Sequence, residues 1–155
     1  MSELKSVLLA IELATRQRDD AAKALAHRRE NLQFAQGQST HLEGYAADTD
    51  ARWIGARDGQ MSAELVRHHY QFMGRLQEAI GLQADVIAEA NTQLERAAKV
   101  LLLAELRLAS LNHILDGRKT ALAITYKRRE QRLTDEFAAM AYTRAKAQLI
   151  YGETV

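Results

Sequence analysis

Five histidines are the side chains of this sequence best suited to metal or acid–base chemistry. His68 and His69 are adjacent, so on a helix they point about 100° apart and cannot bind one metal ion together. His27, His41 and His113 stand far apart along the chain. No glycine-rich phosphate loop, HExxH or CxxC motif is present, and cysteine is absent. The sequence therefore predicts no enzyme, no metal site and no cofactor.

Basic side chains near the C-terminal end form the other chemically distinctive group. Residues 118–155 hold eight basic and four acidic side chains, although the whole chain carries a net charge of only +1. Clustered Lys and Arg can neutralise the phosphates of a nucleic acid, so a nucleic-acid-binding helical hairpin is one alternative function. Glu130, Asp135 and Glu136 interrupt this cluster, and we expect no nucleic acid among the partners.

The elements that position these side chains are predicted to be long helices. Proline is absent and aromatic residues make up only 6% of the chain, which is little for a globular core. The longest run of large apolar residues, Val100–Leu103, is too short to span a bilayer. We therefore expect an extended all-α protein in the cytoplasm, without a direct membrane span.

Apolar or small residues recur every three or four positions along two stretches of the chain. A mean spacing of about 3.5 is typical of the seam of a coiled coil. An extra four-residue step from Ala90 to Leu94 predicts a stutter in the second stretch. That track comprises Phe72, Leu76, Ala79, Val86, Ala90, Leu94, Ala97, Leu101, Ala104, Leu108, Leu111 and Leu115, with Gln83 as its polar member. The weaker first track comprises Leu4, Leu8, Ile11, Ala22, Leu25, Leu32, Ala35, Ser39, Leu42, Ala46 and Trp53, with Thr15, Arg18, Arg28 and Thr49 as polar members.

The periodicity breaks around residues 54–62, where Gly55, Asp58 and Gly59 favour a turn and Ser62 could open the next helix. We predict one all-α domain, residues 1–155: a long two-helix antiparallel coiled-coil hairpin with a C-terminal helical overhang. The first helix spans about 4–56, the turn about 57–61 and the second helix about 62–150. Pairing of two straight chains is the alternative.

The turn sets the register of the hairpin. With its tip near residue 59, the numbers of facing residues sum to roughly 118, within about four. The first helix is then used up near Gly117, and residues 118–150 overhang without a covering helix. This overhang contains the basic cluster and a looser apolar stripe of Leu122, Tyr126, Leu133, Phe137, Met140 and Leu149, which suggests an end that docks elsewhere.

The same register pairs glycines with glycines and aromatics with aromatics. Gly37 falls opposite Gly81, and Gly44 opposite Gly74, all between seam positions; they are either exposed coincidences or a thinly covered section that another protein approaches. Leu42 falls opposite Leu76, and Tyr45 near Phe72. These four side chains either form core, or Tyr45, one step off the seam, leans outward as an anchor for a partner.

Several motifs, in order and spacing, resemble the FliJ family of the bacterial flagellar type III export apparatus. The resemblance covers nearly the whole chain. Its motifs are Asp19–Ala22, Gln38 with Leu42 and Tyr45, Tyr70–Phe72, Leu76, Glu78–Ile80, Gln83, Glu130–Gln131 and Asp135–Phe137. The sequence departs from the family pattern at Thr49, where an aromatic is favoured, and at Gln83, where a histidine is possible.

The resemblance implies an antiparallel two-helix stalk similar to the central stalk of rotary ATPases. Its implied partners are the hexameric flagellar export ATPase, the cytoplasmic side of the export gate membrane protein and the export chaperones, so that the chain serves flagellum assembly and motility. The family's gate-contacting positions fall on Gln38, Leu42, Tyr45, Phe72, Leu76 and Ala79.

The family's ATPase-facing end corresponds to the overhang of this chain. The residues expected to carry that contact are Arg118, Lys119, Lys127, Arg128, Arg129 and Arg132. The implied location is the cytoplasm, peripherally at the inner-membrane export apparatus. The equivalent stalk of an injectisome is the other reading that the resemblance allows.

Overall fold

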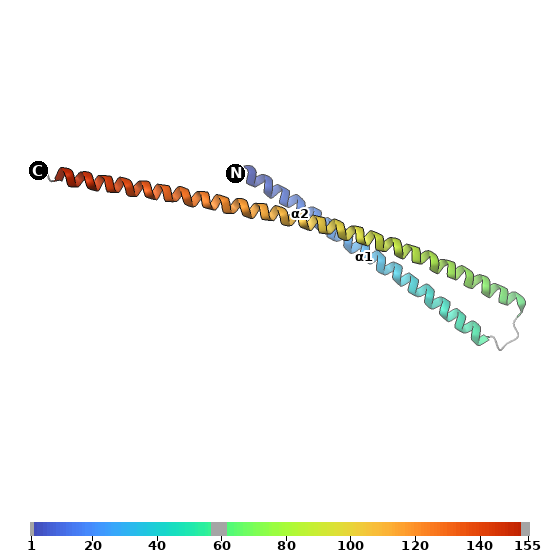
Figure 1. Cartoon of the computed structure of the whole chain (residues 1–155). Coiled ribbons are helices and arrows are strands. Elements are labelled where there is room, and N and C mark those ends of the chain that lie inside the picture. Colours follow the sequence, from blue (N-terminus) through green and yellow to red (C-terminus); the bar gives the residue numbers. More distant parts are fainter. Residues whose placement is uncertain (1, 57–61, 153–155) are drawn as a thin grey trace. The chain divides into compact units, whose positions relative to one another are not determined.

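The computed structural model describes residues 2–56 and 62–152 of the chain, and it contains two helices (Figure 1). Helix α1 runs from Ser2 to Ala56 and helix α2 from Ala63 to Gly152. The predicted turn residues Asp58 and Gly59 lie outside the described residues. The prediction of an all-α antiparallel hairpin with a C-terminal helical overhang is confirmed.

Helix α2 begins with a side-chain cap. The backbone N–H of Leu65 donates a hydrogen bond of 3.2 Å to the Ser62 hydroxyl oxygen, which satisfies one of the amides that the first turn leaves without a partner. The N–H of Val66 donates to the Ser62 carbonyl at 3.3 Å. Ser62 therefore opens α2, as the sequence predicts.

Two compact units make up the chain. Unit 1 consists of Met1–Leu13 and Leu108–Val155, and unit 2 consists of Ala14–Arg107. Each unit takes one segment from α1 and one from α2, because the antiparallel hairpin brings the start of α1 to the middle of α2. In each unit the core is the seam between the two segments.

The core is narrow because only one stripe of each helix meets the other helix. Its buried side chains are mostly small, which lets helical backbones approach closely. In unit 1 they are Val7 and Leu108, and in unit 2 they are Ala14, Ala21, Leu25, Ala35, Ala46 and Leu76. Most other seam residues are half-buried.

The observed register agrees with the predicted one. In unit 2 the numbers of contacting residues sum to 117 for Tyr45 with Phe72 and to 122 for Trp53 with His69. The side-chain amide of Gln83 donates to the Ala35 carbonyl at 2.8 Å, a pair that sums to 118. These values lie within the range that the position of the turn predicts.

The seam itself differs from the predicted track on both helices. Phe72 and Val86 are 40% and 51% exposed, and their neighbours Met73 and Ile87 are the half-buried residues. With Met73, Ile80 and Ile87 in place, the three- and four-residue steps of the α2 seam alternate regularly from Val66 to Leu115, so the predicted stutter is absent. The sequence misleads here because apolar residues stand side by side at both places.

Helix α1 shows a similar displacement over its first part. Leu8 and Ala22 are exposed, whereas Val7, Ala14 and Ala21 are buried. The corrected seam is again a regular heptad repeat, with its seam positions conventionally called a and d. The g position, directly before each a, then lies along one side of the hairpin and the e position along the other.

Candidate functional site

The six residues expected to contact the export gate lie on unit 2 and share one side of it. Gln38, Leu42 and Tyr45 follow the spacing i, i+4, i+7 on α1, so they occupy one helix face. Phe72, Leu76 and Ala79 repeat this spacing on α2. Gln38, Tyr45, Phe72 and Ala79 are all g positions, and g positions face each other across an antiparallel pair. We call these six residues the gate-facing patch.

An aromatic pair marks the centre of the gate-facing patch. The Tyr45 and Phe72 rings meet edge to face, with ring centroids 6.0 Å apart and an interplanar angle of 77°. Tyr45 is 56% exposed, so most of its ring faces solvent. Of the two interpretations that the sequence allows, the structure therefore supports the outward-leaning Tyr45. Such an exposed aromatic pair is suited to anchoring a partner protein.

The rest of the patch divides between seam and surface. Leu76 is buried and Leu42 is half-buried, so both hold the hairpin together beneath the aromatic pair. Gln38 is exposed, and its side-chain oxygen accepts a hydrogen bond of 3.3 Å from the Gln83 amide. Gln83, on the seam, thus fixes Gln38 as well as the Ala35 carbonyl.

The glycines beside the patch have open space around them. A Cβ added at Gly37, Gly44, Gly74 or Gly81 would meet nothing within 4 Å, and none of the four has a positive φ. The prediction that they face away from the opposing helix is therefore confirmed. Packing of this chain does not require glycine at any of these positions.

Two further aromatic rings lie near the turn end of unit 2. Trp53 and His69 stack face to face, with centroids 3.9 Å apart and an interplanar angle of 1°. Both are half-buried seam residues. His69 therefore has a packing role, and among the described residues no group of three or more His, Cys, Asp or Glu is placed to hold a metal ion.

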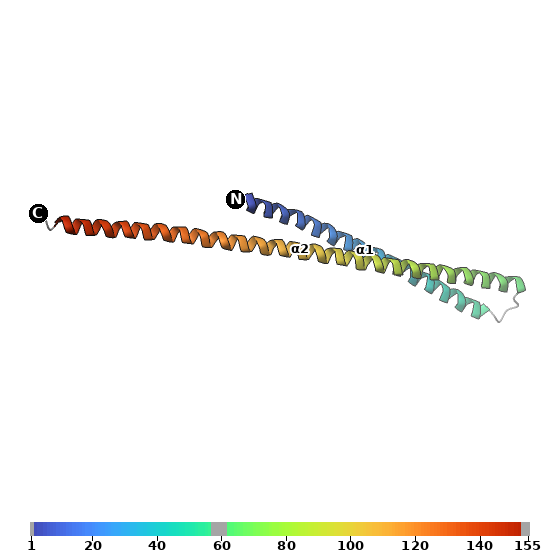
Figure 2. The same cartoon turned by 45° about the horizontal axis from the view of Figure 1, so that its top comes forward.

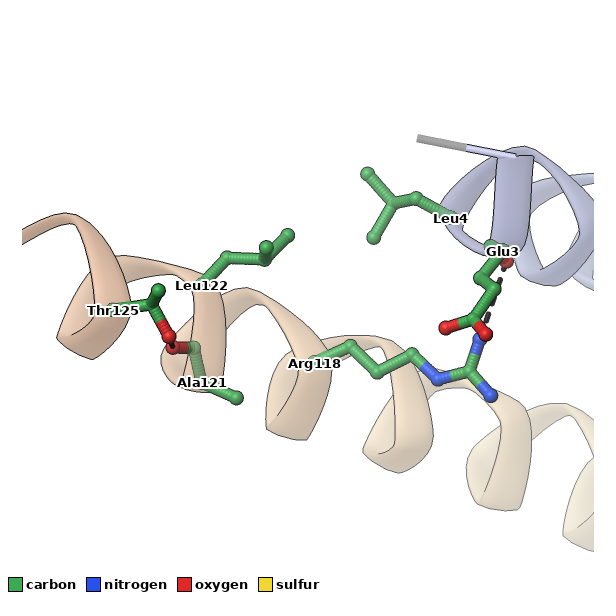
Figure 3. A pocket seen from close by; sticks show the side chains of 6 residues that line it. All are labelled: Glu3, Leu4, Arg118, Ala121, Leu122 and Thr125. Carbon is green, nitrogen blue, oxygen red and sulfur yellow. Dashed lines mark hydrogen bonds between the residues drawn. The ribbon is translucent and has the colours of Figure 1, made fainter.

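Arg118 is the first of the residues expected to contact the ATPase, and it lies where the start of α1 meets α2 in unit 1. Arg118 reaches back from α2 and donates a hydrogen bond of 3.2 Å to the carbonyl of Glu3 in the first turn of α1 (Figure 3). Leu4, Ala121, Leu122 and Thr125 complete a small hollow of about 220 Å³ at this point. Arg118 therefore fixes the start of α1 as well as belonging to the basic cluster.

Beyond Arg118 the overhang is uncovered in unit 1. Every residue of α2 from Asp116 to Gly152 is exposed. Figure 2 draws this part of α2 in orange and red as one continuous helix. A continued heptad would place Arg118, Arg129 and Arg132 at seam positions beyond Leu115. The other expected contact residues, Lys119, Lys127 and Arg128, are spread around the helix rather than along one face.

The apolar stripe of the overhang is exposed as well. Its members from Leu122 to Met140 are more than half exposed and recur at close to 3.6 residues per turn. Leu149 lies about seven and a half turns from Leu122, so it falls on the opposite side of the helix and does not belong to the stripe.

Together these features define a class of protein, the antiparallel coiled-coil hairpins. No helix among the described residues is long and apolar enough to cross a membrane.

The chain belongs to the FliJ family: the family model described as flagellar FliJ protein matches residues 2–147. The chain is therefore a component of flagellar type III export. The family is a structural component of that system and is not a known enzyme family. The match does not support the injectisome interpretation. No curated protein and no solved structure matches the chain.

Proposed function

We propose that this chain is the stalk of the cytoplasmic export machinery, engaging and stimulating the hexameric flagellar export ATPase. The observation that carries the proposal is the uncovered overhang, a helix whose basic side chains and apolar stripe are exposed in unit 1, with Arg118 also hydrogen-bonded to the Glu3 carbonyl. A basic helix end suits an acidic ring lumen, where long-range attraction speeds docking. The stalk itself hydrolyses nothing; it favours the assembled, active ring by binding that state more tightly.

The gate-facing patch supplies the second contact of the proposed stalk. Its exposed Tyr45–Phe72 pair would seat against the cytoplasmic side of the export gate, with Gln38 and Ala79 at the margin. Leu42 and Leu76 contribute mainly by holding the two helices in register beneath the rings. Escort of export chaperones is the third proposed activity, and it places the chain in the cytoplasm, peripherally at the inner membrane.

The proposal is tested by the hydrolysis rate of the cognate flagellar export ATPase, measured alone, with the full chain and with a chain cut after Gly117. We expect stimulation by the full chain and none by the cut chain, because the cut removes the overhang and keeps the seam up to Leu115. Stimulation by both would move the ATPase contact out of the overhang. No effect and no co-elution of either chain with the ATPase would reject the stalk.

A further inference from the structure

A continuous groove runs along unit 2, outside the gate-facing patch and the overhang. It consists of three hollows of about 530, 350 and 190 Å³, of which the first two share Ala24 and Val100 and the last two share Arg28. The groove follows residues 17–31 of α1 and 86–107 of α2. At about 1.5 Å per residue, its length along α2 is roughly 30 Å.

The two walls of the groove differ in size. On α1 the two hollows share the small residues Ala21 and Ala24, with polar Gln17, Asp20 and Arg28 beside them. On α2 the wall presents Val100 and Leu103, which are 57% and 67% exposed. Small residues beside large exposed apolar ones allow another backbone to approach closely while burying apolar surface.

The groove continues the side of the hairpin that carries the gate-facing patch. Val86, Gln93, Val100 and Arg107 are g positions of α2, in line with Phe72 and Ala79 of the patch. The e positions on the other side of α2 are almost all polar or small. Phe72, Val86 and Val100 therefore make this the more apolar side of α2, although Gln93 and Arg107 also lie on it.

Three arginines and two acidic side chains line the groove, so its rim is more basic than acidic. Arg107 lines the first hollow, and Arg28 and Arg96 line the second. The acidic side chains that line the groove are Asp20 in the first hollow and Glu89 in the third. An occupant with acidic flanks would complement this rim, whereas a second copy using the same groove would bring arginines against arginines.

We propose that this groove docks an amphipathic α-helix of another protein, with an apolar stripe flanked by Asp and Glu. A groove between two packed helices is the surface that a third helix fills, ridges into grooves. A length of roughly 30 Å accommodates about 20 helical residues. This proposal does not depend on the ATPase or gate contacts, and it assigns a surface to a third kind of partner.

The test uses a fluorescent designed helix of about 20 residues with a leucine stripe flanked by glutamates. Its binding to the full chain is measured by fluorescence anisotropy. We expect saturable binding of this probe and none of the same peptide with lysines in place of the glutamates. Failure of the glutamate peptide to bind, or equal binding of the two, would overturn the proposal.

A matched pair of variants locates the binding. Val100→Ser with Leu103→Ser should weaken binding of the glutamate peptide by about tenfold or more, since both side chains line the groove. Leu102→Ser with Leu106→Ser is the control: these residues are 54% and 55% exposed and do not line the groove. This control variant should bind the glutamate peptide as tightly as the unchanged chain does. Circular dichroism should show the same helicity for the groove variant and the control variant.

Two results contradict the assignment. Equal weakening by the groove and control variants would mean that the peptide binds elsewhere on the chain. The second contradicting result would come from sedimentation velocity of the full chain. If the chain forms a dimer, and the double variant Val100→Ser with Leu103→Ser abolishes that dimer, the groove is the contact with a second copy instead. A monomer at the concentrations of the binding assay agrees with the proposal.

Discussion

Individual side chains of the gate-facing patch divide into those that hold the hairpin and those that face outward. Leu76 is buried, whereas the Tyr45 and Phe72 rings are exposed and touch at their edges. A buried leucine contributes through the apolar area and packing that its removal forfeits, and an exposed aromatic contributes little to folding. The residue that stabilises the hairpin and the residues exposed to a partner are therefore different members of one patch.

This division predicts different outcomes for two substitutions. Leu76→Ala should lower the free energy of unfolding by about 2–3 kcal/mol. Tyr45→Ala should lower it by less than about 1 kcal/mol, since it removes one edge contact at a solvent-facing site. Urea unfolding followed by circular dichroism measures both. A loss for Tyr45→Ala as large as that for Leu76→Ala would place Tyr45 in the core.

Each helix is continuous because the chain is rich in helix-forming residues and contains no proline. The heptad seam determines which face of each helix packs against the other helix. The four glycines near the patch are exceptions, because glycine in a helix interior costs about 1 kcal/mol relative to alanine. The open space around them means that a methyl group meets no neighbouring atom. Their presence is thus explained by function or chance, and not by packing.

Replacing these glycines should stabilise the hairpin. Gly44→Ala and Gly74→Ala should each raise the free energy of unfolding by roughly 0.5–1 kcal/mol, because the substitution restricts the unfolded chain and creates no clash. Thermal unfolding of each variant measures the gain. If both variants gain stability and still bind the export gate normally, the glycines are coincidental; weaker gate binding would support a thinly covered contact surface.

The helix start at Ser62 permits a second prediction at this scale. Ser62→Ala removes the hydroxyl that accepts the Leu65 amide, and should cost about 1 kcal/mol. Ser62→Asp is the matched control, since a carboxylate can accept the same hydrogen bond and interacts favourably with the helix dipole. Denaturant unfolding should rank serine and aspartate together above alanine, and equal stability of all three would show that the cap contributes nothing.

At the scale of the whole molecule, the chain has three features that could meet a partner: the gate-facing patch, the groove and the overhang. The gate-facing patch and the groove lie on one side of unit 2, and the overhang belongs to unit 1. The overhang lies wholly outside the seam, whereas the patch includes the seam residues Leu42 and Leu76 and the groove includes Ala21. The overhang can therefore be removed without taking any residue from the seam.

Removing the overhang tests this independence. A chain cut after Gly117 should unfold cooperatively in urea and keep the helicity per residue of the full chain, because the seam ends at Leu115. Loss of the hydrogen bond from Arg118 to Glu3 should free only the first turn of α1. Collapse of the circular-dichroism signal would mean that the overhang stabilises the hairpin.

The sequence alone determined the helices, the hairpin, its register and the uncovered end. All of these follow from features that act along the chain: the absence of proline, the repeat of about 3.5 residues, and the turn residues near 59, which set the register. The register prediction also placed Tyr45 near Phe72, and the two rings are in contact.

Only the tertiary structure decided which apolar residues are covered. At Phe72–Met73 and at Val86–Ile87 both neighbours are apolar, so periodicity alone fits a track through either residue. The position of α1 covers Met73 and Ile87 and leaves Phe72 and Val86 on the exposed edge. Burial is a property of two helices together, which is why the sequence predicted a stutter and missed the groove beside Val100.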